Sequence, residues 1–390
     1  MTATRQPIYL DNQATTRCDP RVVDAMLPWF TESYGNPHSA EHAMGRAAEA
    51  AVEAARAEIA ALIGAEAREI VVTSGATESN NLAIKGAAAY VRRTGDPRRR
   101  VVTVATEHKC VLESVRDLAA DGFDPVVLPV GRDGLLDLDR LREALAVPTF
   151  LVSVMAANNE TGVLQDLPAV AALTRAAGAL LHTDAAQAVG KVPVDVGIGI
   201  DLLSISGHNI YGPKGVGALY VRRRTRARIA PLFSGGGQER GLRSGTLPAP
   251  LVVGLGAACR IAGEERAAEA ARIGALRDDL LSRLAAALPG LRVNGSQAAR
   301  LAGNLNVTFP AARALDLMAA APALCVSTGS ACSSAAIEPS YVLAAIGLPT
   351  DEAARTLRIG IGRFTSAADV AQAAELLIAA HAACADRAAA

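Results

Sequence analysis

The sequence predicts an α/β fold in which a large domain is built on a mostly parallel, seven-stranded sheet flanked by helices. Short β-branched runs alternate with alanine-rich helical stretches, and these runs are apolar along their whole length. Continuous apolar strands are typical of a parallel sheet that helices cover on both faces. The expected strands are 69–75, 100–106, 125–130, 149–155, 179–185, 202–207 and 217–222, and the helices between them include 108–121, 137–146 and 167–177.

The pattern changes near residue 260. A long helical run at 257–288 leads to strands at 304–309 and 356–362 and to a final helix at 366–383. This order indicates a smaller α+β domain. We expect two domains, with residues 15–260 forming the large one and residues 1–14 together with 261–390 forming the small one.

Composition and charge exclude several classes of protein. Of the 390 residues, 51% are hydrophobic, which is enough for a sizeable core, and the formal net charge is zero. A neutral chain gives no electrostatic reason to bind nucleic acid or an anionic membrane. The start "MTATRQPIYLDN" does not resemble a signal peptide, and no apolar run is long enough to span a bilayer. The six cysteines form no CxxC pair, which argues against a zinc site and fits a reducing cytoplasm.

Polar motifs follow the expected strands, at the edge of the sheet where sites of α/β proteins lie. "TSGATESNN" (73–81) combines a small-residue turn with a helix start. Its backbone N–H groups and the Thr77 hydroxyl could hold a phosphate, although an ordinary helix cap has the same appearance. "HTDAAQ" (182–187) places Asp184 at a strand end, where a carboxylate could keep a pyridine nitrogen protonated or simply cap the next helix.

Three further motifs are also ambiguous when each is taken alone. "ATEHKC" (105–110) puts His108 just past a strand, where the imidazole could stack on a planar ring, transfer protons or be structural. The amides of "SVMAANNETG" (153–162) could bind a phenolate oxygen or satisfy a turn. "SGGGQERGLRSGT" (234–246) is either a bare loop or the second wall of an anion site.

Cys332 lies in "VSTGSACSSAA" (326–336), a stretch of small residues. A structural cysteine would normally sit among large apolar residues. A cysteine in such surroundings is better explained as a mobile thiol that reacts once it is deprotonated.

The order of these motifs along the chain is far more specific than any one of them. The series TSGATESNN, TEHK, NNETG, HTDAAQ, SGHxIYGPKG, GGGQERGLRSGT and STGSAC resembles the NifS/IscS-type cysteine desulfurases, class V members of the pyridoxal-phosphate (PLP) fold-type-I superfamily. The resemblance runs from "YLDNQATT" near residue 9 to "RIGIGRFT" at 358–365. It implies the PLP fold type I and a homodimer with PLP at the subunit interface.

The resemblance also implies a role for each motif. Cys332 would attack the sulfur of L-cysteine and hold it as a persulfide, releasing alanine, before an iron–sulfur scaffold or a tRNA-thiolation protein accepts it. Apart from a transient cluster ligand role for Cys332, no metal is implied. The implied PLP-binding residues are Ala76, Thr77, His108, Asn159, Asp184, Gln187, Ser206, Gly207, His208 and, from the partner subunit, Thr246; the implied substrate-binding residues are Asn36, Asn159 and Arg358.

One residue departs from the family pattern. After Ser-Gly-His the family carries the lysine that forms a Schiff base with PLP, whereas this chain carries Asn209. An amide nitrogen is not nucleophilic, so PLP would bind noncovalently or as an external aldimine with cysteine. Losing the general acid/base of that lysine costs about 10²–10⁴-fold in rate. Only four lysines exist, Lys85, Lys109, Lys191 and Lys214, and none matches a motif that would replace it.

Three hypotheses follow. The first is a PLP-dependent cysteine desulfurase that Asn209 disables or strongly impairs. The second is a non-catalytic sulfur-relay or cluster-assembly protein in which Cys332 receives sulfur from elsewhere. The third is a different class V reaction, which Cys332 in its small-residue stretch disfavours. A pocket that otherwise retains Asp184, His108 and Arg358 favours the first.

Overall fold

A seven-stranded mixed sheet is the centre of the structure. The computed structural model describes residues 7–223, 229–328 and 340–389, with side chains described to residue 384. The strand order is β2-β8-β7-β6-β5-β3-β4, and β8 alone runs against its neighbours. All seven predicted strands are present, as β2 (Ile70–Thr73), β3 (Arg100–Val104), β4 (Asp124–Leu128), β5 (Thr149–Ser153), β6 (Leu180–Asp184), β7 (Leu202–Ser206) and β8 (Gly217–Val221), which confirms the predicted fold class.

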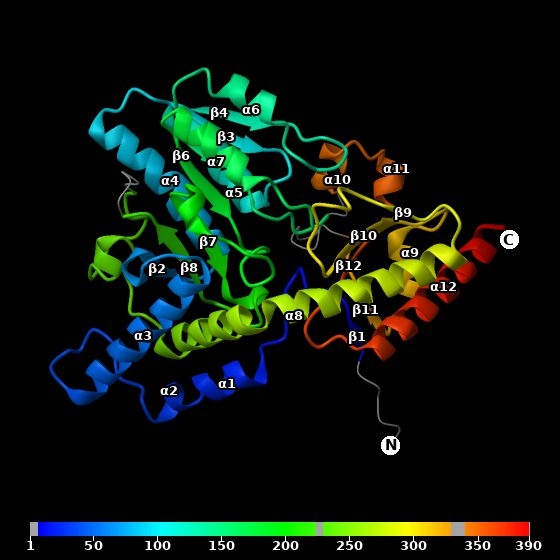
Figure 1. Ribbon diagram of the computed structural model, residues 1–390, viewed down its shortest axis with the longest axis horizontal. Coiled ribbons are helices and arrows are strands. Elements are labelled where there is room, and N and C mark those ends of the chain that lie inside the picture. The colour runs from blue at the N-terminus through cyan, green and yellow to red at the C-terminus, as the bar shows by residue number, and fades with distance from the viewer. Residues whose placement is uncertain (1–6, 224–228, 329–339, 390) are drawn as a thin grey trace.

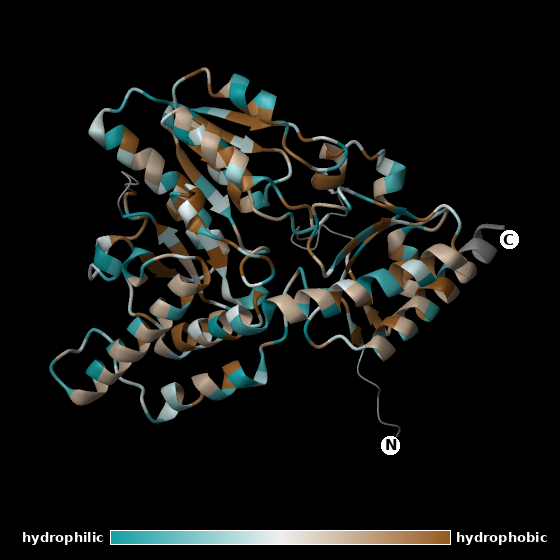
Figure 2. Cartoon of the chain, viewed as in Figure 1, coloured by the Kyte–Doolittle hydropathy of each residue, from teal (hydrophilic) through white to brown (hydrophobic). Residues whose placement is uncertain are grey.

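Helices cover both faces of this sheet (Figure 1). On one face, α4 (Ala76–Thr94) and α5 (Lys109–Asp117) pack against residues such as Val71. On the other face, α3 (Ala43–Leu62), α6 (Leu138–Ala144) and α7 (Leu167–Ala176) pack against residues such as Val72. Because neighbouring strand residues point to opposite faces, both must be apolar, and this explains the continuous apolar runs. Figure 2 shows brown, hydrophobic stretches along these strands.

A second core lies beyond the large sheet, and α8 (Ala249–Ala287) joins the two. Leu255 of α8 packs in the first core and Leu284 in the second. The helix predicted at 257–288 begins earlier, at residue 249, because Pro250 is tolerated in a first turn where its missing N–H is not needed. The division at residue 260 remains a prediction; α8 passes this position without a break.

Two small sheets and several helices complete the second core. The antiparallel sheet has the order β12-β10-β9, and β1 pairs in parallel with β11. Within the described ranges, no helix is long and apolar enough to cross a membrane. The remaining elements are β1 (Ile8–Tyr9), α1 (Pro20–Met26), α2 (Pro28–Thr31), β9 (Arg292–Val293), β10 (Asn304–Thr308), α9 (Ala314–Ala320), β11 (Leu324–Cys325), α10 (Tyr341–Ala345), α11 (Thr350–Ala353), β12 (Thr356–Gly360) and α12 (Ala367–Ala389).

A buried ion pair fastens the glycine-rich segment 234–246 to the large sheet. The guanidinium of Arg56 donates to both carboxylate oxygens of Glu239 at 2.9 Å, and both side chains are less than 5% exposed. Glu239 also accepts the backbone N–H of Val72 in β2. The pair therefore connects α3, β2 and the segment that follows β8.

We predict that Arg56→Met lowers the free energy of unfolding by about 3–5 kcal/mol, because it leaves the Glu239 carboxylate buried without a cation. Chemical denaturation measures this loss, and Arg56→Met combined with Glu239→Gln should recover most of it. Arg283→Met is the matched control, since its pair with Asp279 is exposed and such pairs contribute about 1 kcal/mol or less. Equal losses for the two single variants would contradict the prediction.

A neutral histidine lies in the middle of the sheet. His182 of β6 is fully buried, with Nδ1 2.8 Å from the Ser153 hydroxyl of β5 and Nε2 3.1 Å from the Ser204 hydroxyl of β7. Burial lowers the pKa of His182 to about 3. An unfolded chain takes up a proton on this imidazole below pH 6.5, whereas the folded chain does not. Its contribution to stability is therefore complete above pH 6.5 and is lost as the pH falls toward 3.

We predict that His182→Gln, which keeps polar contacts to the two hydroxyls but cannot ionise, reduces the fall in the free energy of unfolding as the pH is lowered below 6.5. Between pH 6.5 and 5 the unmodified protein should lose about 2 kcal/mol more than the variant. Denaturant unfolding at a series of pH values measures the difference. Parallel curves for the two proteins would show that His182 does not titrate on unfolding.

Candidate functional site

A cavity of about 960 Å³ opens at the carboxyl ends of the central strands. The ends of β2, β6 and β7 contribute Gly75, Asp184 and Ser206, and Arg358 enters from β12 of the second core. Because parallel strands end at one edge, motifs that are far apart in the sequence meet here. This volume falls within the usual range of small-molecule sites.

The cavity brings together most of the residues that the sequence singled out. Three predicted residues lie elsewhere: Asn36 and Thr246 are exposed, and Gly207 is buried behind its neighbours. Cys332 lies outside the described residues. The predicted residues that line the cavity are Ala76, Thr77, His108, Asn159, Asp184, Gln187, Ser206, His208, Asn209 and Arg358.

The turn between β2 and α4 opens the backbone to the cavity. Gly75, the residue before α4, has φ +148°, a conformation that favours glycine, and a Cβ there would project into open space. The first turn of a helix has N–H groups that the helix itself does not use, and its dipole favours an anion. The Ser206 hydroxyl is buried and has no partner among the described residues.

Asp184 is held at the end of β6 by two donors. The Asn80 amide of α4 donates to Oδ2 at 2.7 Å, and the backbone N–H of Ala186 donates to Oδ1 at 3.0 Å. Asp184 is only 5% exposed and forms no ion pair within the described part of the chain. The carboxylate is thus oriented for a cationic group inside the cavity.

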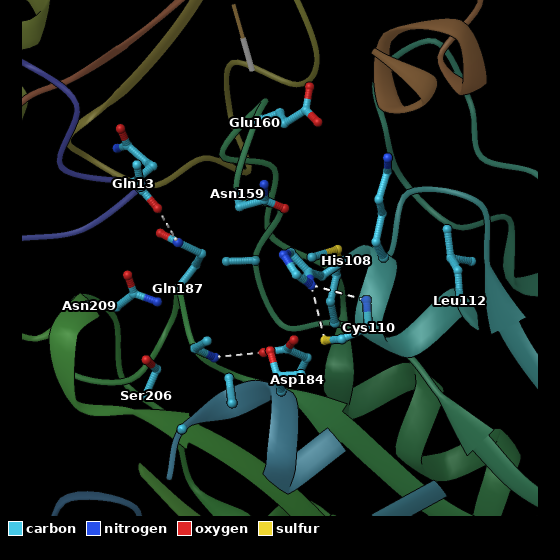
Figure 3. Close-up of a pocket in the computed structure, with 18 of the residues that line it drawn as sticks. Gln13, His108, Cys110, Leu112, Asn159, Glu160, Asp184, Gln187, Ser206 and Asn209 are labelled. Atoms are coloured by element: carbon cyan, nitrogen blue, oxygen red, sulfur yellow. Dashed lines mark hydrogen bonds between the residues drawn. The ribbon is translucent and has the colours of Figure 1, made fainter. Parts of the chain in front are cut away.

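His108 has a tautomer that its surroundings determine. Its Nδ1 accepts the backbone N–H of Cys110 at 3.2 Å and lies 3.0 Å from the Cys110 sulfur (Figure 3). A backbone N–H can only donate, so Nδ1 carries no proton and Nε2 carries it. The Cys110 sulfur also accepts from the Asn80 amide at 3.2 Å. A polar chain therefore runs from Asp184 through Asn80 and Cys110 to His108.

Gln187 and Asn209 lie in the opposite wall (Figure 3). Gln187 donates from Nε2 to the backbone carbonyl of Gln13 at 2.9 Å. Asn209 follows β7 in a single 3₁₀ turn, is 5% exposed, and leaves Oδ1 buried without a partner among the described residues. Burial and the positive charges of Lys214 and Lys191 lower the pKa of the neighbouring His208.

Arg358 is the buried cation of the cavity. It is 2% exposed, donates from Nη2 to the Asp11 carboxylate at 2.8 Å and from Nη1 to the Asn159 carbonyl at 3.1 Å, and leaves Nε unpaired among the described residues. The Asn159 side-chain oxygen is buried and unpaired as well. The unused N–H of the guanidinium is suited to a ligand carboxylate, whereas the Asn159 amide oxygen can only accept and so suits a ligand donor.

The segment 234–246 packs on the turn before α4. The guanidinium of Arg243 lies 2.8 Å from the Glu78 carboxylate, which also accepts the backbone N–H of Ser74. Arg240 donates to the backbone carbonyl of Arg68. Both arginines of this motif therefore have protein partners.

Sequence reasoning missed several residues that complete the site. Asn80, Cys110 and Gln13 support or line the cavity, but only their place near a motif could have drawn attention to them. Among the four lysines, Lys109 and Lys214 line the cavity, and Lys85 pairs with Asp117 on the surface.

Comparisons with known proteins agree with this geometry. The family described as "Aminotransferase class-V" matches residues 8–372. The mitochondrial cysteine desulfurase of Drosophila melanogaster is 54% identical over 366 residues, which cover 94% of this chain and 79% of that protein. The cysteine desulfurase IscS of Rickettsia bellii is 50% identical over 372 residues, covering 95% of this chain and 90% of the relative.

A solved structure shows the same fold. The structure of a NifS-like protein superposes with a TM-score of 0.88 and 36% identity, covering 96% of this chain and 98% of that chain. Cysteine desulfurases of this family use pyridoxal 5′-phosphate. By its family match, its relatives and its fold, this chain belongs to the class V aminotransferase family, among the NifS/IscS-type cysteine desulfurases.

Proposed function

We propose that this protein binds PLP in the cavity as a cysteine desulfurase does, with L-cysteine as substrate and Cys332 as sulfur carrier, and that Asn209 strongly impairs turnover. The proposal rests on one observation: several residues that line the cavity have buried polar atoms without a hydrogen-bond partner in the part of the chain that the structure describes. Ser206 Oγ, Asn159 Oδ1 and Arg358 Nε have no partner among the described residues. Each such group costs about 1–3 kcal/mol unless a ligand pairs with it.

The residues fit PLP group by group. The N-terminus of α4, with Ala76 and Thr77, offers N–H donors for the phosphate, and Ser206 and His208, which line the same cavity, would bind it as well. Asp184 offers its charge to the pyridine nitrogen, and Gln187 retains an N–H for the phenolic oxygen. Gly207 serves the turn itself, since a Cβ there would lie 2.8 Å from the Pro213 carbonyl.

When bound, PLP supplies an electron sink for the bonds at the substrate Cα. Asp184 keeps the ring nitrogen protonated, because a buried carboxylate stabilises a cation beside it. His108 would stack on the ring, in the tautomer that carries its proton on Nε2. Arg358 and Asn159 would orient the substrate, with the unused N–H of Arg358 donating to the substrate carboxylate and the Asn159 amide oxygen accepting from a substrate donor. Asn36, which is exposed and accepts the backbone N–H of His38, would contact the substrate only after a rearrangement.

Cys332 would take the substrate sulfur as a persulfide and pass it to an iron–sulfur scaffold or another acceptor protein. The described chain resumes at Ser340, whose hydroxyl donates to Glu160 in the cavity wall. Tyr341 donates to the Glu107 carbonyl at 2.7 Å. Burial raises the pKa of the Glu160 carboxyl, which lines the cavity. These contacts join the chain after Cys332 to the site.

A homodimer is part of the proposal, with Thr246 contributing to the phosphate site of the partner subunit. Thr246 is exposed on its own chain, outside the cavity. Leu27, Phe30 and Tyr34, on and after α1 and α2, are each more than half exposed, which suits a protein interface. A cytoplasmic location remains a prediction, and the name of the Drosophila relative assigns that relative to mitochondria.

Asn209 is the reason for impaired turnover. Its amide can neither form a Schiff base nor exchange protons near neutral pH, so both functions of a lysine at this position are lost. Lys109 and Lys214 line the cavity, but neither occupies the position that follows Ser-Gly-His. The intact donor set around the cavity favours PLP binding over a sulfur relay that makes no use of it.

We predict that the protein binds PLP without a borohydride-reducible bond and forms little or no alanine from L-cysteine. Asn209→Lys should create a Schiff base between the chain and PLP that borohydride reduces. It should also raise alanine formation by about 10²-fold or more, because it restores the amine and its proton transfer. Reduction followed by peptide mass spectrometry, with an alanine assay, measures both.

Cys332→Ala in the Asn209→Lys background is the control, and it should abolish sulfide release while leaving the reducible bond. Rapid alanine formation by the unmodified protein would contradict the role given to Asn209. A revertant that binds no PLP would instead favour the sulfur relay.

A further inference from the structure

One partly buried amine, that of Lys191, has no part in the proposed mechanism. Lys191 follows Gln187 by one helical turn, formed by hydrogen bonds such as that from the Val189 N–H to the Ala185 carbonyl at 2.9 Å. Its Nζ donates to Gln187 Oε1 at 3.0 Å. Lys191 does not line the large cavity but lines a separate one of about 40 Å³. Its amine therefore acts on the large cavity only through Gln187.

Two independent contacts set the orientation of the Gln187 amide. A lysine amine at neutral pH has donors only, so the atom it contacts must be the amide oxygen. A backbone carbonyl only accepts, so the atom 2.9 Å from the Gln13 carbonyl must be the amide nitrogen. Both contacts require the same orientation, and the second N–H of Nε2 is left for the cavity that Gln187 lines.

The charge on Lys191 strengthens that N–H. Desolvation lowers the pKa of Lys191 to about 8, with Glu269 opposing the shift and Arg358 adding to it, so the amine is mostly cationic at neutral pH. A cation bound to an amide oxygen withdraws electron density from the nitrogen, which makes its N–H a better donor. A stronger donor binds an anionic oxygen more tightly but gains nothing from a C–H group, so it increases the difference in affinity between ligands with and without that oxygen.

We propose that Lys191 is a positioning residue that fixes and polarises Gln187, so that the cavity selects a pyridine ligand with an anionic ring oxygen over one that lacks this oxygen. The inference rests on the proposed PLP site. Lys191 thus takes part in recognising the cofactor. It does not replace the lysine that would bond to PLP at position 209.

Equilibrium binding of two ligands tests this role. The ligands are PLP and 3-deoxypyridoxal 5′-phosphate, which lacks only the ring oxygen. Lys191→Met keeps the unbranched side chain and removes the donor. It should weaken PLP binding about tenfold, the loss expected for one hydrogen bond to a charged group, and change 3-deoxypyridoxal phosphate binding by less than about twofold. Lys85→Met, which removes a surface lysine, should change neither.

A double-mutant cycle with Gln187→Leu makes the test specific. If Lys191 acts through Gln187, Lys191→Met should have no further effect on PLP binding in the Gln187→Leu background. Equal weakening of both ligands by Lys191→Met would show a merely structural role and overturn the proposal, as would a full effect in the Gln187→Leu background. If the unmodified protein binds neither ligand, the PLP site itself is wrong, an outcome distinct from the failure of Lys191 alone.

Discussion

The buried carboxylate of Asp184 is the constraint on which the rest of the site depends. It lies at the end of the central strand β6, is 5% exposed, and is held by Asn80 and the Ala186 N–H. A buried charge is costly unless a partner of opposite sign neutralises it. Among the described residues no ion pair does so. A cationic ring nitrogen in the cavity meets this requirement, and the neighbouring donors can then be read as contacts to the remainder of such a ligand.

Three further parts of the cavity lining, those that contain His108, Gln187 and Arg358, are held in place by contacts with residues around them. The backbone N–H of Cys110 determines the proton position on His108, and the Cys110 sulfur connects this ring through Asn80 to Asp184. On the opposite wall, Gln13 and Lys191 orient Gln187. Arg358 arrives from the second core, because β12 runs beside β10 and ends near Asp11. The site therefore requires both cores in place, and α8, which packs in each, holds them together.

The sequence predicted the parts of the site that lie in continuous motifs. The seven strands follow from apolar runs, and residues such as Asp184 and Ser206 follow from the rule that polar residues at strand ends share one edge. Contacts between distant segments could not be predicted in this way. Asn80 reaches a residue 104 positions away and Gln187 one 174 positions away, and no local pattern encodes such pairs. The role proposed for Thr246 involves a second subunit, and one chain cannot show such a contact.

Asn209 separates binding from chemistry in this account, since the cavity keeps its donors while the position that would hold a nucleophilic amine carries an amide. The most direct test is the electron density of crystals grown with PLP. We expect the ring stacked against His108 with its nitrogen beside Asp184, the phosphate at the start of α4, and no continuous density from the ring to any side chain. Continuous density from the ring to Lys214 or Lys109, or a cavity that excludes the ring, would contradict it.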